Sequence, residues 1–203
     1  MIKVVSSDFF TTSSERDNWP PPIRPEVAFV GRSNVGKSSM INCLCNRRKL
    51  VRVSNTPGRT RTLNFFDVLL EKGPRTREMR LVDLPGYGYA KASKTDRNQW
   101  QQMADAYLQQ RPVLKVVVSI IDAEIGPTED DEQMLQVLMA APPKILVAAT
   151  KIDRLARTKQ KNRVVSIAHK LGLPVEAVIG FSSTERIGVQ PVWESLLQGA
   201  DLV

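Results

Sequence analysis

Short apolar runs alternate along the chain with longer stretches in which apolar residues recur at helical spacing. The apolar or β-rich runs predict six strands, at residues 27–31, 62–70, 79–83, 113–122, 144–150 and 175–181. The intervening stretches predict helices at residues 37–46, 95–110, 158–171 and 192–197, and another that begins at Thr128. Because nearly continuous apolar strands alternate with helices, we expect an α/β fold with a mostly parallel six-stranded sheet and helices on both faces.

The first part of the chain departs from this alternation. Residues 62–70 and 79–83 flank a turn that contains Gly73 and Pro74, so we expect them to pair as a hairpin, with one strand antiparallel to the rest of the sheet. Residues 1–25, which include three consecutive prolines from position 20, are interpreted as a leader into the first strand. Residues 26–203 are expected to form a single domain.

The composition is that of a globular protein. Of the 203 residues, 42% are hydrophobic and 25% are charged, which excludes a disordered chain. The most apolar stretch, residues 113–121, is short and contains Lys115, so no membrane span is expected. Residues 1–25 lack the apolar core of a secretory signal, and Cys43 and Cys45 lie two apart on a predicted helix, where they cannot pair. These features favour a cytoplasmic protein.

Charge is distributed unevenly along the chain. The net charge is +8, yet residues 47–80 hold ten basic and three acidic residues, and residues 154–170 hold six basic residues and no acidic ones. Residues 122–132 show the reverse, with six acidic residues and no basic ones. Two basic blocks in a chain of this size favour a polyanionic partner, nucleic acid first. A solvated charged surface without a partner is the alternative.

A glycine-containing motif lies between the first predicted strand and the first predicted helix. It reads G-x-x-x-x-G-K-S and comprises Gly31, Arg32, Ser33, Asn34, Val35, Gly36, Lys37 and Ser38. A strand before this motif and a helix after it are typical of a phosphate-binding loop. The glycines let backbone N–H groups surround phosphate oxygens, Lys37 supplies a positive charge, and Ser38 offers a hydroxyl to Mg²⁺.

A second motif, Asp83-Leu84-Pro85-Gly86, ends a predicted strand about 45 residues after the phosphate-binding loop. An acid at the carboxyl end of a strand suits a carboxylate that reaches Mg²⁺ through water, and this is the role expected for Asp83. The Gly86 N–H is expected to meet the γ-phosphate. After a phosphate-binding loop, the motif predicts a nucleoside triphosphate site.

A third motif, Thr150-Lys151-Ile152-Asp153, ends a later predicted strand. The Asp153 carboxylate can accept two parallel hydrogen bonds from the N1–H and 2-amino group of guanine, whereas adenine offers no such pair of donors. The Lys151 stem can lie over the base plane. Beyond the last predicted strand, a backbone N–H of the run Phe181, Ser182 and Ser183 can meet the guanine oxygen. The three motifs together predict GTP as the nucleotide.

The ordered motifs GRSNVGKS, TPGRTRTLNFF, DLPGYGYA, TKID and FSS resemble those of the Ras-type GTPase superfamily. Within it, PGRT at residues 57–60, LNFF at residues 63–66 and GYGYA at residues 86–90 closely resemble the EngB family, also called YihA or YsxC, of bacterial ribosome-biogenesis GTPases. The resemblance extends from about Glu26 to the C-terminal helix. It implies a three-layer P-loop GTPase fold, with residues 26–203 as one GTPase domain.

The resemblance also implies a function. A cytoplasmic protein of this kind binds GTP and GDP and hydrolyses GTP to GDP and phosphate with Mg²⁺. It is expected to act as a monomer in assembly of the large ribosomal subunit or its precursor, in contact with rRNA and ribosomal proteins. The family has also been linked to cell division and septation.

The loop between the first helix and the second strand resembles the first switch of these GTPases. It contains the expected GTP-binding residues Gly58, Arg59, Thr60, Arg61 and Thr62. The resemblance implies that the Thr60 hydroxyl joins Mg²⁺ directly, as Ser38 does, with Thr62 as the lower-ranked alternative. Lys37, Thr60 and Gly86 are therefore the expected catalytic residues.

Three residues bear on how the site would work. Tyr87 stands where Ras-like enzymes place a glutamine that orients the attacking water, so we expect slow intrinsic hydrolysis that a partner accelerates. Thr150 replaces the common asparagine, which we expect to weaken one tie to the phosphate-binding loop. Asn34 occupies the position where some related GTPases coordinate K⁺, which makes K⁺ a second candidate cofactor.

Two functions stay open at the level of the sequence. The first is a GTP-hydrolysing switch that contacts rRNA on a ribosomal particle through basic surface near the switch loops. The second is a GTP-dependent protein-binding switch in cell division. The basic blocks favour the first because they flank the expected switch and base-binding edges.

Overall fold

The structure is a computed structural model that describes residues 1–51, 62–87 and 94–203, without the side chains of residues 94–101. The strands are β1 (Ile2–Ser13), β2 (Glu26–Gly31), β3 (Leu63–Lys72), β4 (Arg75–Asp83), β5 (Leu114–Asp122), β6 (Lys144–Thr150) and β7 (Val178–Gly180). The helices are α1 (Lys37–Leu44), α2 (Lys94–Gln110), α3 (Glu129–Met139), α4 (Arg157–Leu171) and α5 (Val189–Gly199). Short 3-10 turns occupy Arg16–Asn18, Ile152–Arg154 and Val175–Ala177.

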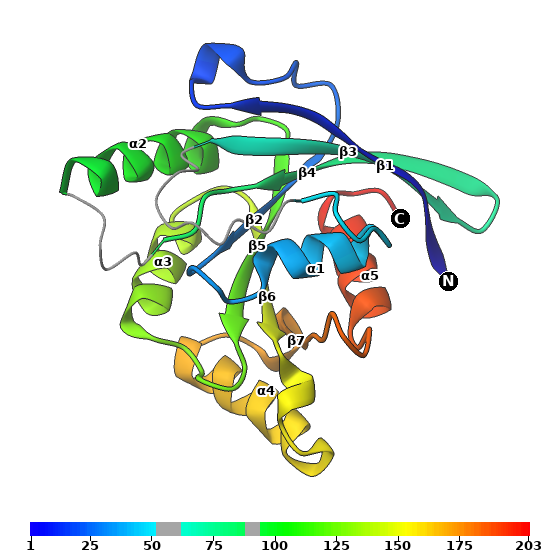
Figure 1. The fold of residues 1–203 in the computed structure, drawn as a ribbon, viewed down its shortest axis with the longest axis vertical. Helices are drawn as coiled ribbons and strands as arrows, with labels where there is room; N and C mark the ends of the chain where they lie inside the picture. The colour runs from blue at the N-terminus through cyan, green and yellow to red at the C-terminus, as the bar shows by residue number, and fades with distance from the viewer. Residues whose placement is uncertain (52–61, 88–93) are drawn as a thin grey trace.

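Within the described residues, the strands form one seven-stranded sheet in the order β1-β3-β4-β2-β5-β6-β7 (Figure 1). Strands β4, β2, β5, β6 and β7 are parallel neighbours, whereas β3 runs antiparallel to both β1 and β4. The predicted α/β class, the mostly parallel sheet and the single antiparallel strand are confirmed. A loop of two residues joins β3 to β4, as expected for the hairpin around Gly73 and Pro74.

The sheet has one strand more than the six expected, because β1 comes from residues that we interpreted as leader. This edge strand is rich in serine and threonine, and its register shifts next to Val5 and Phe10. Each bulge moves the next side chain to the other face, so the alternation that signals a strand is broken. The last strand, β7, is shorter than expected because residues 175–177 form a 3-10 turn after Pro174.

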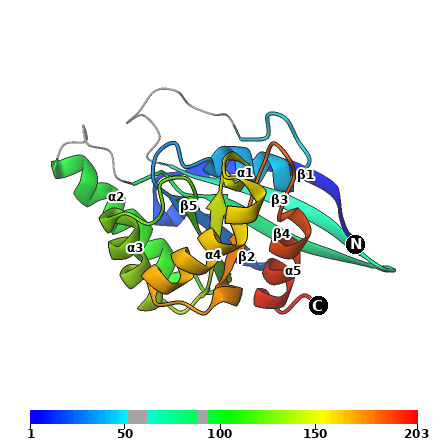
Figure 2. The same cartoon turned by 90° about the horizontal axis from the view of Figure 1, so that it is seen from below.

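Helices cover both faces of the sheet, and Figures 1 and 2 show α1 and α5 on one side with α2 and α3 on the other. Alternate residues of β2 explain the arrangement. Val27 and Phe29 pack in the cluster that includes α1 and α5, whereas Ala28 and Val30 pack in the cluster that includes α2 and α3. Helix α4 packs in a third cluster with β6 and β7. Burial on both faces is why the central strands are continuously apolar.

A buried ionic cluster fixes α2 to the start of the sheet. The Glu26 carboxylate accepts hydrogen bonds from the Tyr107 hydroxyl at 2.6 Å and from Arg111 Nε at 2.8 Å. Arg111 also donates to the Pro20 carbonyl at 2.8 Å, and its guanidinium lies 5.9 Å from the Trp19 ring centroid. Burial and the neighbouring carboxylate both raise the pKa of Tyr107. The segment before β2 is therefore tied to the sheet through α2.

The carboxyl ends of the parallel strands β2, β4, β5, β6 and β7 lie along one edge of the sheet. The loops that leave this edge contain the three motifs identified in the sequence. Ligands of open α/β sheets bind at such an edge. In the part of the chain that the structure describes, no helix has the length and apolar character needed to span a membrane.

Candidate nucleotide site

The phosphate-binding loop joins β2 to α1 and depends on two glycines. Gly36 has φ of 96° at the N-cap of α1, a left-handed conformation that favours glycine. A Cβ at Gly31 would lie 2.9 Å from Val35 Cγ2 and 3.1 Å from the Ile120 carbonyl oxygen. The tight loop therefore leads directly into the N-terminus of α1, where unpaired N–H groups and the helix dipole favour an anion.

Lys37 and Asp83 meet across this edge. Lys37 begins α1 and Asp83 ends β4, and the Lys37 ammonium forms an ion pair with Asp83 Oδ1. The exposed fractions of the two side chains are 12% and 9%. The structure thus places the cation of the first motif against the carboxylate of the second.

A single cavity of about 930 Å³ unites residues of all three motifs. Its lining includes residues of the phosphate-binding loop, of the Asp83–Gly86 motif and of the third motif, namely Arg32, Ser33, Asn34, Gly36, Lys37, Ser38, Asp83, Leu84, Pro85, Gly86 and Lys151. Thr62, the residue before β3, also lines it. Gly58, Arg59, Thr60 and Arg61 lie outside the described residues.

The Asp83–Gly86 loop returns to the phosphate-binding loop. Backbone hydrogen bonds run from Tyr87 N to the Gly31 carbonyl at 3.3 Å and from Ser33 N to the Tyr87 carbonyl at 3.2 Å. A Cβ at Gly86 would lie 3.3 Å from both the Gly31 carbonyl oxygen and Ser33 N. The close approach of the two loops therefore explains why glycine occupies position 86.

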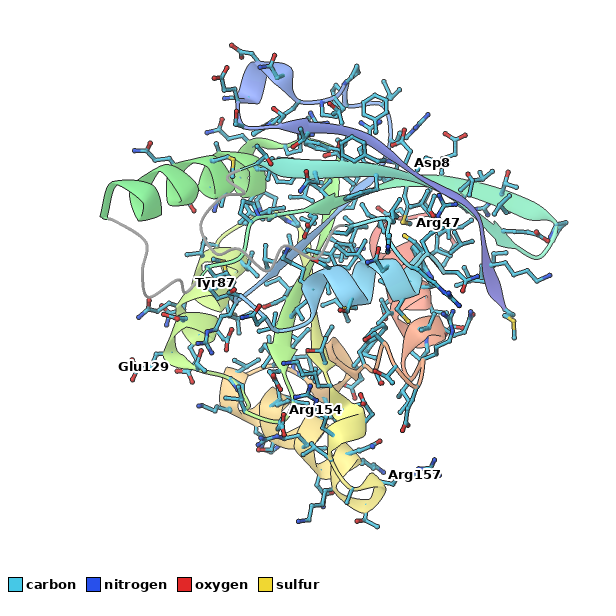
Figure 3. All side chains as sticks on the ribbon, viewed as in Figure 1. Asp8, Arg47, Tyr87, Glu129, Arg154 and Arg157 are labelled. Atoms are coloured by element: carbon cyan, nitrogen blue, oxygen red, sulfur yellow. The ribbon has the colours of Figure 1, made fainter. Side chains whose placement is uncertain are left out.

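The Tyr87 side chain packs against α3 instead of lining the cavity. Its hydroxyl donates to Asp131 Oδ1 at 2.9 Å, and its exposed fraction is 7%. Figure 3 shows Tyr87 near the N-terminal end of α3, where Glu129 is labelled. Burial and the Asp131 carboxylate raise the pKa of Tyr87 far above its usual range. The phenol therefore stays protonated and fixed to α3.

The third motif is tied to the phosphate-binding loop by two side chains. Thr150 Oγ1 lies 2.6 Å from the Val35 carbonyl and 3.1 Å from the Ile121 carbonyl, and Lys151 Nζ lies 3.0 Å from the Asn34 carbonyl. A threonine hydroxyl has one proton to donate, and the shorter contact is to the loop. The tie that we expected to be weakened by the loss of asparagine is therefore present.

Asp153 follows in the 3-10 turn Ile152–Arg154 and is partly exposed. The described residues that line the cavity include its neighbours Lys151 and Arg154, but not Asp153 itself. Ile152 is buried, and its N–H donates to the Phe181 carbonyl at 3.2 Å. This bond holds the turn of the third motif against the loop that follows β7.

Oxygen atoms suited to a divalent cation lie at the phosphate end of the cavity. The Ser38 hydroxyl and the Asp83 carboxylate both belong to its lining. Among the described residues, no group of three His, Cys, Asp or Glu side chains could hold a metal. Mg²⁺ takes oxygen ligands and is often bound through one or two protein groups together with phosphates and water. The side chains present fit that donor set.

Comparisons with known proteins agree on one family. Residues 26–151 match the model of a family described as a 50S ribosome-binding GTPase. The "Probable GTP-binding protein EngB" of Myxococcus xanthus is 57% identical over 197 residues, which are 97% of this chain and 96% of the relative. The chain belongs to the EngB family of GTP-binding proteins. Members of this family are GTPases, so the chain is an enzyme that hydrolyses GTP.

Solved structures give the same fold. A crystal structure of a probable EngB has a TM-score of 0.66 at 21% identity and covers 87% of this chain and 98% of its own. A crystal structure of Era in complex with MgGDPNP and nucleotides 1506–1542 of 16S ribosomal RNA has a TM-score of 0.68 at 25% identity. That match covers 86% of this chain and 56% of the Era chain.

In this EngB chain, most of the loop that directly follows β7 is buried and bonded within the fold. Phe181 and Ser182 are fully buried, whereas Ser183 is exposed. The Phe181 N–H donates to the Ala149 carbonyl at 2.8 Å, and the Ser182 N–H donates to the Ile187 carbonyl at 3.1 Å. Two of the three N–H groups that we considered for the guanine oxygen are therefore bonded within the fold, and Ser183 is the remaining one.

Asp122 and Asp131 contact residues of the three EngB motifs and their flanks, and sequence reasoning assigned a role to neither. Asp122 ends β5, and its Oδ2 lies 2.6 Å from Lys151 Nζ. Asp131 lies in the first turn of α3 and accepts the Tyr87 hydroxyl. Asp122 carried a usable signal, because it ends an apolar strand beside the strand of the third motif. Asp131 carried no such signal, because acids are common in the first turn of a helix and indicate no particular partner.

Proposed function

We propose that this EngB chain is a Mg²⁺-dependent GTP switch that acts in assembly of the large ribosomal subunit in the cytoplasm and contacts rRNA. Residues 26–203 are the GTPase domain in this proposal, with β1 added at the edge of its sheet. The observation that carries it is the convergence of three motifs, far apart in sequence, on one cavity.

The residues divide the work between the two ends of the cavity. At the phosphate end, loop N–H groups and the Lys37 ammonium bind β- and γ-phosphate oxygens, and the Gly86 N–H meets the γ-phosphate. Ser38 and Thr60 are the direct ligands for Mg²⁺, with Asp83 reaching it through water. Mg²⁺ supplies neutralisation of charge on the phosphates. At the base end, Asp153 selects guanine, Lys151 lies over the ring, and the Ser183 N–H, the remaining candidate of the Phe181–Ser183 run, meets the guanine oxygen.

Lys37 and Asp83 exchange partners in this scheme. The ion pair between them stabilises both charges inside the fold. When Lys37 turns to phosphate oxygens, Asp83 becomes available for a cation and its water. One substitution at Lys37 therefore affects the charge balance of the whole phosphate end.

Hydrolysis is proposed to be slow without a partner. The Tyr87 hydroxyl is held by Asp131, so this side chain does not orient a water in the cavity. An orienting or charge-stabilising group supplied by a docked partner fits this arrangement. Asn34, which is exposed and has φ of 65°, remains the residue proposed to contact K⁺, and equal hydrolysis rates in K⁺ and Na⁺ would contradict that role.

The proposed rRNA contact relies on basic side chains that project from the fold. Arg47, Arg48 and Lys49 are exposed after α1, and Lys49 lines the cavity. On α4, Arg157, Lys159 and Lys161 are exposed. Figure 3 labels Arg47, just after α1, and Arg157, the first residue of α4. The 16S ribosomal RNA held by Era and the description of the matched family support RNA as the polyanion.

Substitution of Lys37 by alanine tests the nucleotide site. The change removes the charge from the centre of the phosphate end and leaves Asp83 unpaired, so we expect GTP and GDP binding to weaken by at least about 30-fold. Fluorescent-nucleotide titration of Lys37→Ala beside the parent protein measures this. A variant that still bound GTP normally would overturn the site.

Cosedimentation with ribosomal subunits tests the ribosomal function. We expect binding that is stronger with a non-hydrolysable GTP analogue than with GDP and that falls as salt rises, because phosphate contacts release counterions. Arg48→Glu should weaken binding several-fold, whereas the control Lys115→Glu, an exposed position at the start of β5 away from the cavity edge, should not. Binding indifferent to nucleotide and salt would contradict the ribosomal role and favour the protein-binding switch of cell division.

A further inference from the structure

Asp122 is nearly buried at the end of β5, beside Lys151, which lines the cavity. Its exposed fraction is 5%. Strands β5 and β6 are parallel and in register, with Asp122 opposite Thr150. The register therefore places this carboxylate beside Lys151, the residue that follows β6.

Two hydrogen bonds define the orientation of the Asp122 carboxylate. Oδ1 accepts the Glu124 N–H at 2.9 Å, and Oδ2 lies 2.6 Å from Lys151 Nζ. The Lys151 ammonium also donates to the Asn34 carbonyl at 3.0 Å. The flexible lysine is thus held at its tip by one acceptor from β5 and one from the phosphate-binding loop.

The loop that connects Asp122 to α3 is held in place by hydrogen bonds from α4. Arg163 of α4 donates to the Ala123 carbonyl and, at 2.6 Å, to the Glu124 carbonyl. Lys170, also from α4, donates to the Pro127 carbonyl at 2.7 Å. These contacts hold the β5–α3 loop, so the position of Asp122 is fixed by the fold and not by Lys151 alone.

We propose that Asp122 is a positioning residue for guanine-nucleotide binding, which acts by holding the Lys151 ammonium beside Asn34. With its tip held there, the methylene stem of Lys151 spans from the end of β6 to the phosphate-binding loop. The stem is then already positioned to pack against the guanine base before the nucleotide binds. A preorganised side chain loses less freedom when the nucleotide binds. This inference rests on the proposed role of the third motif at the base end.

A double-mutant cycle tests the coupling between the two residues. Asp122→Asn keeps an oxygen for the Glu124 N–H but loses the charge that holds Lys151, and we expect GDP to bind about tenfold more weakly. Lys151→Met keeps the stem and removes the ammonium. In the Lys151→Met background, Asp122→Asn should change GDP affinity by less than about twofold, because its partner is gone. A full tenfold loss in both backgrounds would overturn the proposal, because Asp122 would then act through the fold.

Two controls separate this inference from the proposed function. Glu124→Gln alters an exposed carboxylate on the same loop, which pairs with Arg154, and should leave GDP affinity unchanged. If Asp153→Ala and Lys151→Met both leave GDP affinity unchanged, the proposed base site fails. If they weaken binding and Asp122→Asn does not, the positioning role of Asp122 alone fails.

A further pair of variants covers the case in which Asp122→Asn does not fold. Lys151→Arg keeps a charged partner for Asp122, whereas Lys151→Met does not. Lys151→Arg should therefore bind GDP more tightly than Lys151→Met. The reverse order would overturn the proposal.

Discussion

Two cations of the nucleotide site, Lys37 and Lys151, already have partners within the fold. Lys37 pairs with Asp83, and Lys151 contacts both Asp122 and the Asn34 carbonyl. Each cation is held by an acceptor that lies at the end of a neighbouring strand. A buried charge without a partner is costly, so these pairs let the site keep its cations inside the fold.

The two cysteines lie where their thiols are protected from reagents. Cys43 and Cys45 are buried at the end of α1, and burial raises the pKa of both thiols, that of Cys45 to about 12. At pH 8 we expect the native protein to react with Ellman's reagent much more slowly than urea-unfolded protein, because the thiolate is the reactive form.

The raised pKa of the buried thiols also predicts how the free energy of unfolding changes with pH. Folded thiols keep their protons at pH values where unfolded thiols, with a pKa of about 8.5, lose them. The stabilisation is therefore present below about pH 8.5 and decreases as pH rises above it. Urea unfolding at pH 7.5 and 9.5 measures this, with a Cys45→Ala variant as the control for other titrating groups. A native protein whose thiols react as fast as in urea would contradict both expectations.

The acidic block at residues 122–132 forms contacts with neighbouring elements inside the molecule. Asp131 accepts the Tyr87 hydroxyl, and Asp130 lies 3.6 Å from Arg32 Nε.

Two further acids of the block face the basic residues 154–170. Glu124 pairs with Arg154, and Glu132 pairs with Lys170. Residues 122–132 therefore join the two loops of the phosphate end to α4 and to the 3-10 turn before it, and part of the basic block at residues 154–170 is balanced within the fold.

Substitution of Tyr87 by phenylalanine separates structure from catalysis. The change removes the hydrogen bond to Asp131 and leaves one buried carboxylate oxygen with fewer donors, so we expect a loss of about 1–2 kcal/mol in the free energy of unfolding. Basal GTP hydrolysis should stay within about twofold, because the side chain does not line the cavity. Single-turnover hydrolysis and urea unfolding measure the two effects. A large loss of hydrolysis at unchanged nucleotide affinity would give Tyr87 a direct catalytic part.

The elements that were predicted from sequence are those whose local pattern and tertiary environment agree. Strand β5 is apolar on both faces, and Asp83 and Thr150 end their strands as expected. Strand β1 was missed because its bulges and polar side chains suit a sheet edge. The Tyr87–Asp131 contact depends on how α3 is turned against the sheet, which side-chain packing decides and short-range pattern does not.

The Glu26 cluster holds α2 and the segment before β2 against the sheet. Arg111→Ala would leave Glu26 with Arg80, whose Nη1 lies 3.8 Å from Glu26 Oε1, and with the Tyr107 hydroxyl. We expect a loss of about 3 kcal/mol in the free energy of unfolding, because one partner of a buried pair is removed. Urea denaturation measures it.

The control for this experiment is Arg75→Ala at the exposed β3–β4 turn, where we expect a change within about 0.5 kcal/mol. Equal losses in the free energy of unfolding of the two variants would show that the buried cluster contributes no more to stability than an exposed side chain.

Strand β1 has a consequence for the order in which the protein is completed. Its partner β3 begins at Leu63, and the backbone of Ile2 exchanges two hydrogen bonds of 2.8 Å with the Gln190 side chain, 188 positions later. At a synthesis rate of roughly 5–20 residues per second, about 10 to 40 seconds separate the emergence of these two residues. The contact between Ile2 and Gln190 can therefore form only after α5 has been made, whereas β1 can pair with β3 much earlier.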